Sequence, residues 1–281
     1  MMRSLLELGI SLAFPRGNSV GGFARAECVV LRYRGVTDAQ APRFRRQIEW
    51  LAAHTNIIPA ADIPRVPASP TDARRTVAIT FDAAFENLER NAIPMLRQMR
   101  IPATLFAVSA NLGRKPKWVL TRFHSEAEEM LMAEGPLAAL PRDLFEIGSH
   151  TATHRNLTRL SRGEIRAELA NSKNDLQLSL GRPITALSVP YGQWNREILE
   201  VAQEIGYSQV FTCDPIAASI GSNNLAIGRF EVTPDDWMPE FMLKATGSLR
   251  SFARRRDLPK INSPPKPRGP RSAHQRQTAA V

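Results

Sequence analysis

Apolar runs alternate with amphipathic stretches along most of this chain. Short apolar runs that predict strands occupy residues 26–33, 76–81, 103–108, 144–148, 186–190, 207–212 and 225–232. Stretches with helical spacing occupy residues 44–53, 86–99, 161–180 and 196–205. The longest of these helices begins with Ser161-Arg-Gly-Glu164, a capping-box pattern in which a hydroxyl and a carboxylate satisfy free backbone donors.

Repeated strand-then-helix units predict an α/β fold in which helices cover a parallel sheet. Polar or unusual residues recur where the strands end, at Asp82, His150, Pro190-Tyr191 and Asp214. In parallel barrels the loops that follow the strands form one face, and that face holds the site. Residues that are far apart in the sequence are therefore expected to converge. For Asp214, which precedes Pro215, a turn-forming role is the stronger interpretation.

Composition and breaks in the pattern suggest three regions. Residues 1–25 read as an N-terminal extension, residues 26–248 as the α/β domain and residues 249–281 as a tail rich in Arg and Pro. Within the domain, residues 118–141 interrupt the alternation and read as a mostly helical insertion near the mouth of the site. Cys28 and Cys213 lie in apolar runs, which favours buried free thiols over a disulfide.

The positive charge of the chain is concentrated in its tail. Residues 250–281 hold nine basic side chains and one acidic side chain, a net charge of +8 out of +10 for the whole chain. Such a tail is typical of a solvated, disordered segment. Binding to an anionic membrane surface is an alternative, whereas aromatic residues that would stack on nucleic-acid bases are scarce. Glu7 interrupts the N-terminal apolar run, and no stretch has the length of a membrane span, so we expect a cytoplasmic protein.

Asp82 ends the apolar run Ala78-Ile-Thr-Phe-Asp82. A buried carboxylate is costly unless it has a partner, which points to a functional or ion-paired acid. Asp is also a good N-cap for the helix that follows. The segment alone leaves the two interpretations equal.

His150 and His154 lie four residues apart after another predicted strand, in Gly148-Ser-His-Thr-Ala-Thr-His154. Two imidazoles at this spacing can face one divalent metal from a helix or a tight loop. Two surface histidines are the alternative. The position at a strand end favours the metal, with zinc as the first choice.

A Pro-aromatic-Gly turn, Pro190-Tyr191-Gly192, follows a third strand. Such a turn can aim a backbone N–H at a ligand and present an aromatic wall to a sugar ring. A plain structural turn is equally consistent with this segment.

Together these motifs resemble the polysaccharide deacetylase family, over residues 26–244. Thr80-Phe-Asp82 matches the start of its Thr-Phe-Asp-Asp motif, His150-Thr-Ala-Thr-His154 its paired-histidine motif, and Val189-Pro-Tyr-Gly192 the core of its Arg-x-Pro-Tyr motif. The resemblance implies a distorted (β/α) barrel of about seven parallel strands and metal-dependent removal of acetyl groups from N-acetylated sugars. It implies Asp82 as the general base, Tyr191 N–H as the oxyanion donor, and His150 and His154 as ligands of a divalent metal such as zinc.

The chain departs from the family pattern at three positions. Ala83 stands where the family has a metal-ligand Asp, Ser188 where it has Arg, and Arg229 where its late, proton-donating His is sought. Catalytic zinc normally has three protein ligands, so the implied site is weakened. Two hypotheses therefore follow: a metal-dependent carbohydrate N-deacetylase, and a pseudo-deacetylase that binds carbohydrate without turnover.

Overall fold

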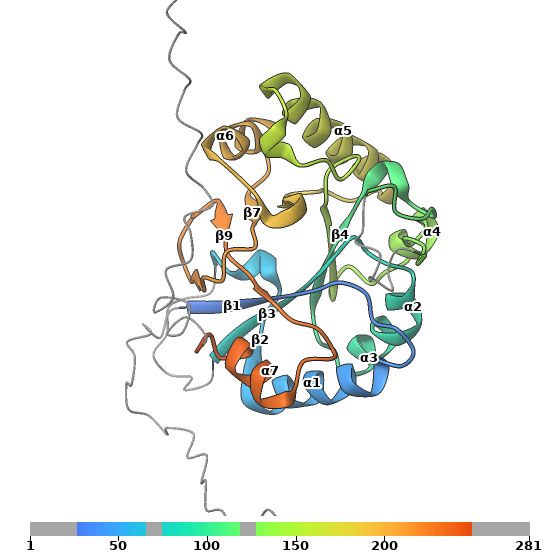
Figure 1. The fold of residues 1–281 in the computed structure, drawn as a ribbon, viewed down its shortest axis with the longest axis vertical. Helices are drawn as coiled ribbons and strands as arrows, with labels where there is room; N and C mark the ends of the chain where they lie inside the picture. Colours follow the sequence, from blue (N-terminus) through green and yellow to red (C-terminus); the bar gives the residue numbers. More distant parts are fainter. Residues whose placement is uncertain (1–26, 66–74, 119–127, 249–281) are drawn as a thin grey trace, which may run out of the picture.

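A nearly closed barrel of mostly parallel strands, with helices around it, forms the body of the protein (Figure 1). A computed structural model describes residues 27–65, 75–118 and 128–248. The expected N-terminal extension and tail lie outside these residues. Along the barrel wall the strands follow the order β10-β1-β3-β4-β5-β6-β7-β9, and each neighbouring pair is parallel. The predicted (β/α) barrel is confirmed.

The elements follow the predicted alternation closely. The strands of the wall are β1 (Glu27–Tyr33), β3 (Arg75–Asp82), β4 (Ala103–Ala107), β5 (Phe145–Ser149), β6 (Ala186–Ser188), β7 (Gln209–Phe211), β9 (Ala226–Ile227) and β10 (Phe230–Glu231). Two further strands flank it: β2 (Thr55–Ile57) pairs with β3, and β8 (Ala218–Ser219) runs antiparallel to β1. The helices are α1 (Ala41–His54), α2 (Asn87–Asn91), α3 (Ile93–Gln98), α4 (Glu134–Ala138), α5 (Arg162–Leu180), α6 (Arg196–Ile205) and α7 (Met238–Ala245).

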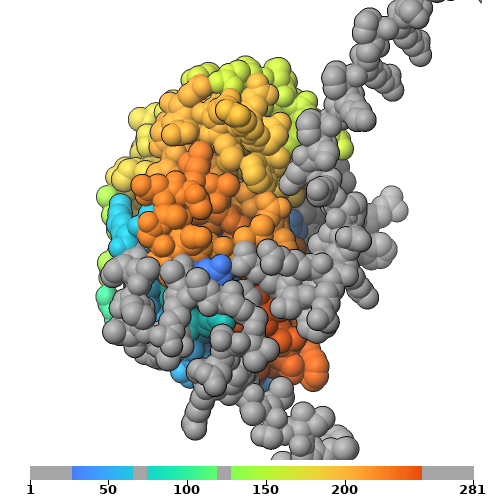
Figure 2. Space-filling model, turned by 90° about the vertical axis from the view of Figure 1, so that its left-hand side faces the viewer, coloured from blue at the N-terminus to red at the C-terminus, as the bar shows by residue number. Residues whose placement is uncertain are grey.

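The last predicted strand, over residues 225–232, is divided into two pieces. Its first half, β9, pairs with β7, and its second half, β10, pairs with β1. The division falls at Gly228 and Arg229, where a side chain on Gly228 would meet the Asp214 carbonyl oxygen at 2.5 Å. The two halves thus bring the two ends of the strand order close together, and the barrel is nearly closed. Seen from the side, the orange residues that include β8 to β10 reach the blue start of β1 (Figure 2).

Alternation along each strand decides which side chains enter the barrel. On β3, Val77, Ile79 and Phe81 pack in the larger core under the helices, whereas Ala78 packs inside the barrel with residues such as Val30, Phe106 and Phe211. Asp82 lies on the same face of β3 as Ala78. On β1, Arg32 lies on the same face as Val30. Both charged side chains therefore point into the barrel interior at its carboxyl end.

Two predictions of local structure need correction. The single helix expected over residues 86–99 is two short helices, because Pro94, in the first turn of α3, lacks the N–H that would continue the helix, and Ala92 between them has a φ of −117°. The expected insertion is not mostly helical where the structure describes it: between 128 and 141 only the five-residue α4 is an α-helix, and Leu131 forms a β-bridge with Phe85. Residues 119–127 of that insertion lie outside the described part.

The capping box predicted for the longest helix is present. The Ser161 side chain accepts a hydrogen bond from Glu164 N, and the Glu164 carboxylate accepts one from Ser161 N. Of the helices in the described ranges, none is long and apolar enough to cross a membrane.

Candidate active site at the carboxyl end of the barrel

Asp82 lies at the centre of a buried network of charged side chains. Arg229 Nη1 donates to its Oδ1 at 2.7 Å and Arg229 Nη2 to its Oδ2 at 3.0 Å. Arg32 Nη1 donates to Oδ2 at 3.3 Å, and Ser188 Oγ to Oδ1 at 2.9 Å. Both carboxylate oxygens are thus engaged. The alternative of an N-cap is wrong, because Glu86 holds the N-cap position of the helix that follows.

The network keeps Asp82 ionised. Burial acts to raise its pKa, but the charges of Arg229, His150 and Arg32 oppose burial, and the pKa lies well below its usual range. Arg229 has no spare donor: its Nε bonds to Thr212 O, and its Nη atoms also reach Thr80 and Ser188. Arg32, Asp82 and Arg229 thus form a buried ion-pair network that joins β1, β3 and the link between β9 and β10.

His150 and His154 come together on the loop after β5, and both are buried. Their ring centroids are 4.8 Å apart with the rings nearly perpendicular. His150 Nδ1 lies 2.8 Å from Ser188 O, an arrangement that fixes its ring. His154 has left-handed backbone (φ 61°), and its N–H donates to Thr151 Oγ1 at 3.0 Å. The alternative of two surface histidines is wrong.

Both imidazoles are neutral at physiological pH. Burial lowers the pKa of His150 to about 4, with the Asp82 carboxylate opposing the shift. Burial and the neighbouring His150 lower the pKa of His154 to about 2. His154 Nδ1 is buried and has no hydrogen-bond partner among the residues that the structure describes. A neutral imidazole with an unused nitrogen is a competent metal ligand.

Apolar side chains surround Ala83, at the position where the family motif has its ligand Asp. Ala83, Phe85, Val108 and Leu131 form a small buried cluster, and Trp118 packs against it. The Trp118 indole also stacks on the His154 ring, with centroids 4.1 Å apart and planes 17° apart. The space beside Ala83 is therefore lined by hydrocarbon and an indole.

These residues do not fit a three-ligand catalytic metal centre. The described part of the chain holds no group of three or more His, Cys, Asp or Glu side chains that could hold a metal ion. Asp82 does not supply the missing ligand, because arginines and Ser188 occupy its oxygens. The donor set is two imidazoles, one fewer than catalytic zinc normally takes.

Tyr191 stands at the edge of this centre in a strained turn. Its backbone is left-handed (φ 61°, ψ 2°), and its half-exposed ring contacts His154 edge-on with centroids 5.0 Å apart. Next to it, Gly192 has φ 66°, and a Cβ there would lie 2.2 Å from Cys213 Cβ. Glycine is therefore required at this position.

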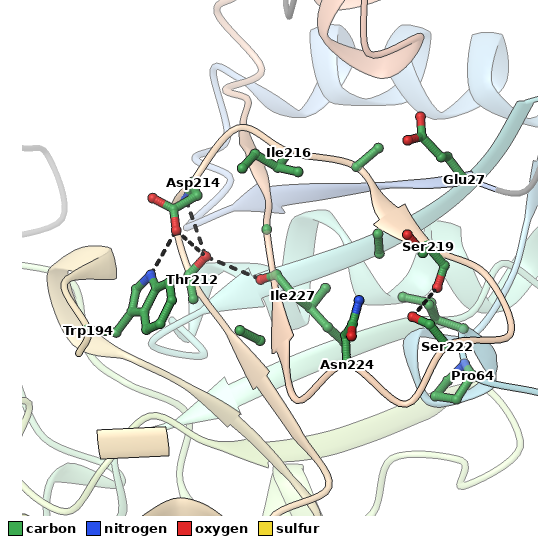
Figure 3. A pocket seen from close by; sticks show the side chains of 15 residues that line it. Glu27, Pro64, Trp194, Thr212, Asp214, Ile216, Ser219, Ser222, Asn224 and Ile227 are labelled. Atoms are coloured by element: carbon green, nitrogen blue, oxygen red, sulfur yellow. Dashed lines mark hydrogen bonds between the residues drawn. The ribbon is translucent and has the colours of Figure 1, made fainter. Parts of the chain in front are cut away.

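Asp214 belongs to a different hollow, of about 240 Å³ (Figure 3). Its Oδ2 accepts hydrogen bonds from Trp194 Nε1 at 2.7 Å and from Thr212 Oγ1 at 3.3 Å. Ser219, Ser222 and Asn224 line the same hollow. Cys213 beside it is half-buried, which corrects the expectation that both thiols are buried; Cys28 is buried as predicted.

The sequence model of the family described as "Polysaccharide deacetylase" matches residues 69–210, half of the chain. This range contains Asp82, both histidines and Tyr191. The chain belongs to the polysaccharide deacetylase family. The resemblance inferred from the three motifs is thereby confirmed.

Two curated relatives of this chain are named as deacetylases. A putative polysaccharide deacetylase, YxkH of Bacillus subtilis, is 26% identical over 216 residues, which cover 74% of this chain and 72% of the relative. A poly-beta-1,6-N-acetyl-D-glucosamine N-deacetylase of Staphylococcus aureus is 25% identical over 202 residues, which cover 69% and 67%.

Solved structures share the fold of this deacetylase-family chain. IcaB from Ammonifex degensii superposes with a TM-score of 0.65 at 22% identity, covering 78% of this chain and 97% of that chain. The Streptococcus pyogenes deacetylase PplD, solved with acetate, gives 0.63 at 19% identity, covering 78% and 98%.

Sequence reasoning did not foresee the partners of Asp82. It noted Arg229 as a departure from the family pattern but did not pair it with the carboxylate. A signal was present, since arginines in apolar strands are buried only with an anionic partner. Trp118 was assigned to the insertion, and nothing in its surroundings in the sequence pointed to His154.

Proposed function

We propose that this chain binds an N-acetylated saccharide at the carboxyl end of its barrel and does not hydrolyse it at an appreciable rate. The observation that carries the proposal is the state of Asp82. Its carboxylate is held by Arg229, Arg32 and Ser188, while its neighbour Ala83 offers a methyl group instead of a ligand.

Three chemical roles lack a suitable side chain. A general base needs a pKa near the working pH, and Asp82 lies far below it. A general acid must release a proton, and Arg229 does not do so in proteins. A third protein ligand is missing at Ala83. These losses support binding without turnover.

Features that recognise a saccharide remain. Trp118, His154 and Tyr191 form a contiguous aromatic edge, and the Tyr191 ring is half-exposed. Aromatic faces are suited to pack against the apolar faces of sugar rings. The named substrate of the Staphylococcus aureus relative, a polymer of N-acetylglucosamine, supports N-acetylated glucosamine units as the ligand.

N-deacetylation is the second candidate function. The contact between His150 and His154 favours it, as does His154 Nδ1, which is buried without a hydrogen-bond partner among the described residues. In that case His150 and His154 would hold a divalent metal, with zinc the first choice. The metal would supply Lewis-acid chemistry, and Tyr191 N–H would be the oxyanion donor.

The deciding experiment measures binding and acetate release on the same purified protein. Oligomers of β-1,6-linked and β-1,4-linked N-acetylglucosamine are titrated by calorimetry, and acetate is measured with and without added zinc. We expect binding that Tyr191→Ala weakens, and no acetate above the no-protein background. Trp237→Ala is the matched control, because Trp237 is also an exposed aromatic residue, at the start of α7.

Two results would overturn the proposal. Zinc-dependent acetate release from the unmodified protein would establish the second candidate. Failure of every oligomer to bind would remove saccharide recognition. The cytoplasmic location and the membrane-binding role of the tail stay predictions, because they rest on residues outside the described part of the chain.

A further inference from the structure

We propose that the hollow beside Tyr191 is a subsite for an anionic group on the saccharide, with Arg159 as the residue that recognises it. This inference rests on the proposed saccharide binding and adds the charge of the ligand. The subsite is defined by Tyr191, Gln193, Arg155, Asn156, Arg159 and Leu160, which line a hollow of about 580 Å³. That volume is in the range of small-ligand sites.

The position of the hollow connects it with the active-site motifs. One wall is the turn after β6 that carries Tyr191, and the other is the loop that continues from His154. Since the Tyr191 ring also contacts His154, a sugar packed on that ring extends from the histidines into the hollow. The backbone that carries the ring is constrained by its left-handed turn and by the close packing of Gly192 against Cys213. Such preorganisation reduces the entropy lost on binding.

Arginine dominates the charge of the hollow. No Asp or Glu is among its lining residues in the described chain. Arg155 is partly neutralised by Glu164, at 3.1 Å. Arg159, by contrast, is exposed and makes no ion pair with any residue that the structure describes. Other surface arginines do make such pairs, including Arg100 with Asp143 at 3.0 Å.

The backbone around Arg159 is well defined. Asn156 caps the short 3₁₀ turn Leu157–Arg159 by accepting hydrogen bonds from Thr158 N at 3.1 Å and Thr158 Oγ1 at 2.8 Å. Asn156 Nδ2 donates to Gln193 Oε1 at 2.8 Å, which joins the two walls. The amide group of Gln193 is thereby oriented, with its Nε2 left for sugar hydroxyls.

These features select a sugar with a negatively charged substituent. The planar guanidinium of Arg159 can donate two parallel hydrogen bonds to a carboxylate or a phosphate. A neutral N-acetylglucosamine oligomer would use only the tyrosine face and the amides. We therefore expect a saccharide in which uronic acid, or a phosphorylated sugar, accompanies N-acetylglucosamine.

Matched ligands test the inference on the full-length protein. A tetrasaccharide of alternating glucuronate and N-acetylglucosamine is compared with the neutral N-acetylglucosamine tetramer, and N-acetylglucosamine 6-phosphate with N-acetylglucosamine. At low salt we expect the anionic member of at least one pair to bind about five- to tenfold more tightly. Arg159→Gln should abolish that preference, so that the anionic member of the pair binds no more tightly than its neutral partner. Arg155→Gln should reduce it less, and the exposed Arg97→Gln on α3 should have no effect.

The outcomes separate this inference from the proposed function. If neutral and anionic ligands bind equally, or if Arg159→Gln keeps the preference, the anionic subsite is refuted while saccharide binding stands. If no ligand binds at all, the proposed function fails first. A preference seen only for the phosphate, or only for the glucuronate, supports the subsite and identifies its anion. The preference should shrink as salt is raised, because it rests on exposed charge.

Discussion

Arg229 donates one hydrogen bond to each carboxylate oxygen of Asp82, at 2.7 and 3.0 Å, from the point where the last barrel strand divides. The motif acid of a deacetylase fold is thus the anionic half of a buried ion pair. Its partner, Arg229, lies at the position where the family pattern has a histidine. The same contact ties the end of β3 to the segment between β9 and β10.

Breaking this pair should cost much more than breaking a surface pair. Arg229→Met leaves the buried carboxylate with Arg32 as its remaining ion-pair partner among the described residues, so we expect the free energy of unfolding to fall by about 3 to 5 kcal/mol. The double variant Asp82→Asn, Arg229→Met should lose less than the sum of the two single losses. Urea denaturation measures both. Arg43→Met, which breaks the exposed pair with Asp235, is the control and should cost under about 1 kcal/mol. Equal losses for Arg229→Met and Arg43→Met would contradict a structural role for the pair.

Restoring a carboxylate at position 83 should create metal affinity at the expense of stability. Ala83 has left-handed backbone (φ 69°), which Asp tolerates better than most residues. Without metal, the new carboxylate faces Phe85, Val108 and Trp118, and we expect a loss of about 1 to 3 kcal/mol. Zinc should recover that loss and bind at least about tenfold more tightly than to the unmodified chain.

Calorimetric zinc titration and thermal unfolding of Ala83→Asp provide the two measurements. Ala83→Asn, which has the same shape without the charge, is the control and should gain no zinc affinity. If Ala83→Asp binds zinc no better than Ala83→Asn, then His150, His154 and residue 83 do not face a common point.

The buried histidines should make the protein sensitive to mild acid. Their folded-state pKa values, about 4 for His150 and about 2 for His154, lie below the ordinary value of 6.5. The unfolded chain therefore takes up protons first, and stability that is complete above pH 6.5 falls as the pH drops from there toward 4. Each histidine contributes a slope of about 1.4 kcal/mol per pH unit. The charged groups that act on the pair are Asp82, Arg229, Arg32 and Arg34.

Denaturation between pH 7 and pH 4.5 checks this slope. His154→Gln should reduce it by about half, since one proton-binding group is removed. His54→Gln, at an exposed histidine, should leave it unchanged. A flat profile for the unmodified protein would show that the two rings are protonated or solvated in the folded state. The Asp82 carboxylate loses its contribution only at lower pH, below about 4.

Gly192→Ala should disturb both the fold and the saccharide site. The added Cβ would lie 2.2 Å from Cys213 Cβ on a left-handed backbone, so we expect a loss of about 1 to 3 kcal/mol. Because the turn carries Tyr191, saccharide affinity should fall as well. Gly163→Ala on α5 meets no atom within 4 Å and should be neutral or stabilising by up to about 1 kcal/mol. Unimpaired saccharide binding by a folded Gly192→Ala protein would argue against the turn as the positioning element.

Sequence reasoning predicted a parallel sheet covered by helices, and the convergence of Asp82, His150 and His154, because both follow from local pattern and from the geometry of parallel strands. The closure of the sheet into a barrel was implied by the family resemblance. It could not predict the partner of Asp82. Arg229 and Asp82 are 147 residues apart, and their meeting depends on how the last strand divides between two neighbours. The stacking of Trp118 on His154 could not be predicted either, because Trp118 lies in a loop whose sequence has no periodicity.

The divided last strand also sets where the chain can change in length. β9 and β10 are separated only by Gly228 and Arg229, and each piece is in register with a different neighbour. An insertion or deletion between residues 227 and 230 would shift one register against the other and move the guanidinium away from Asp82. The residues before 226 do not have to keep two strand registers at once. Variation in loop length among descendants of this chain, natural or engineered, is therefore expected on the N-terminal side of β9 and not inside the two-residue link.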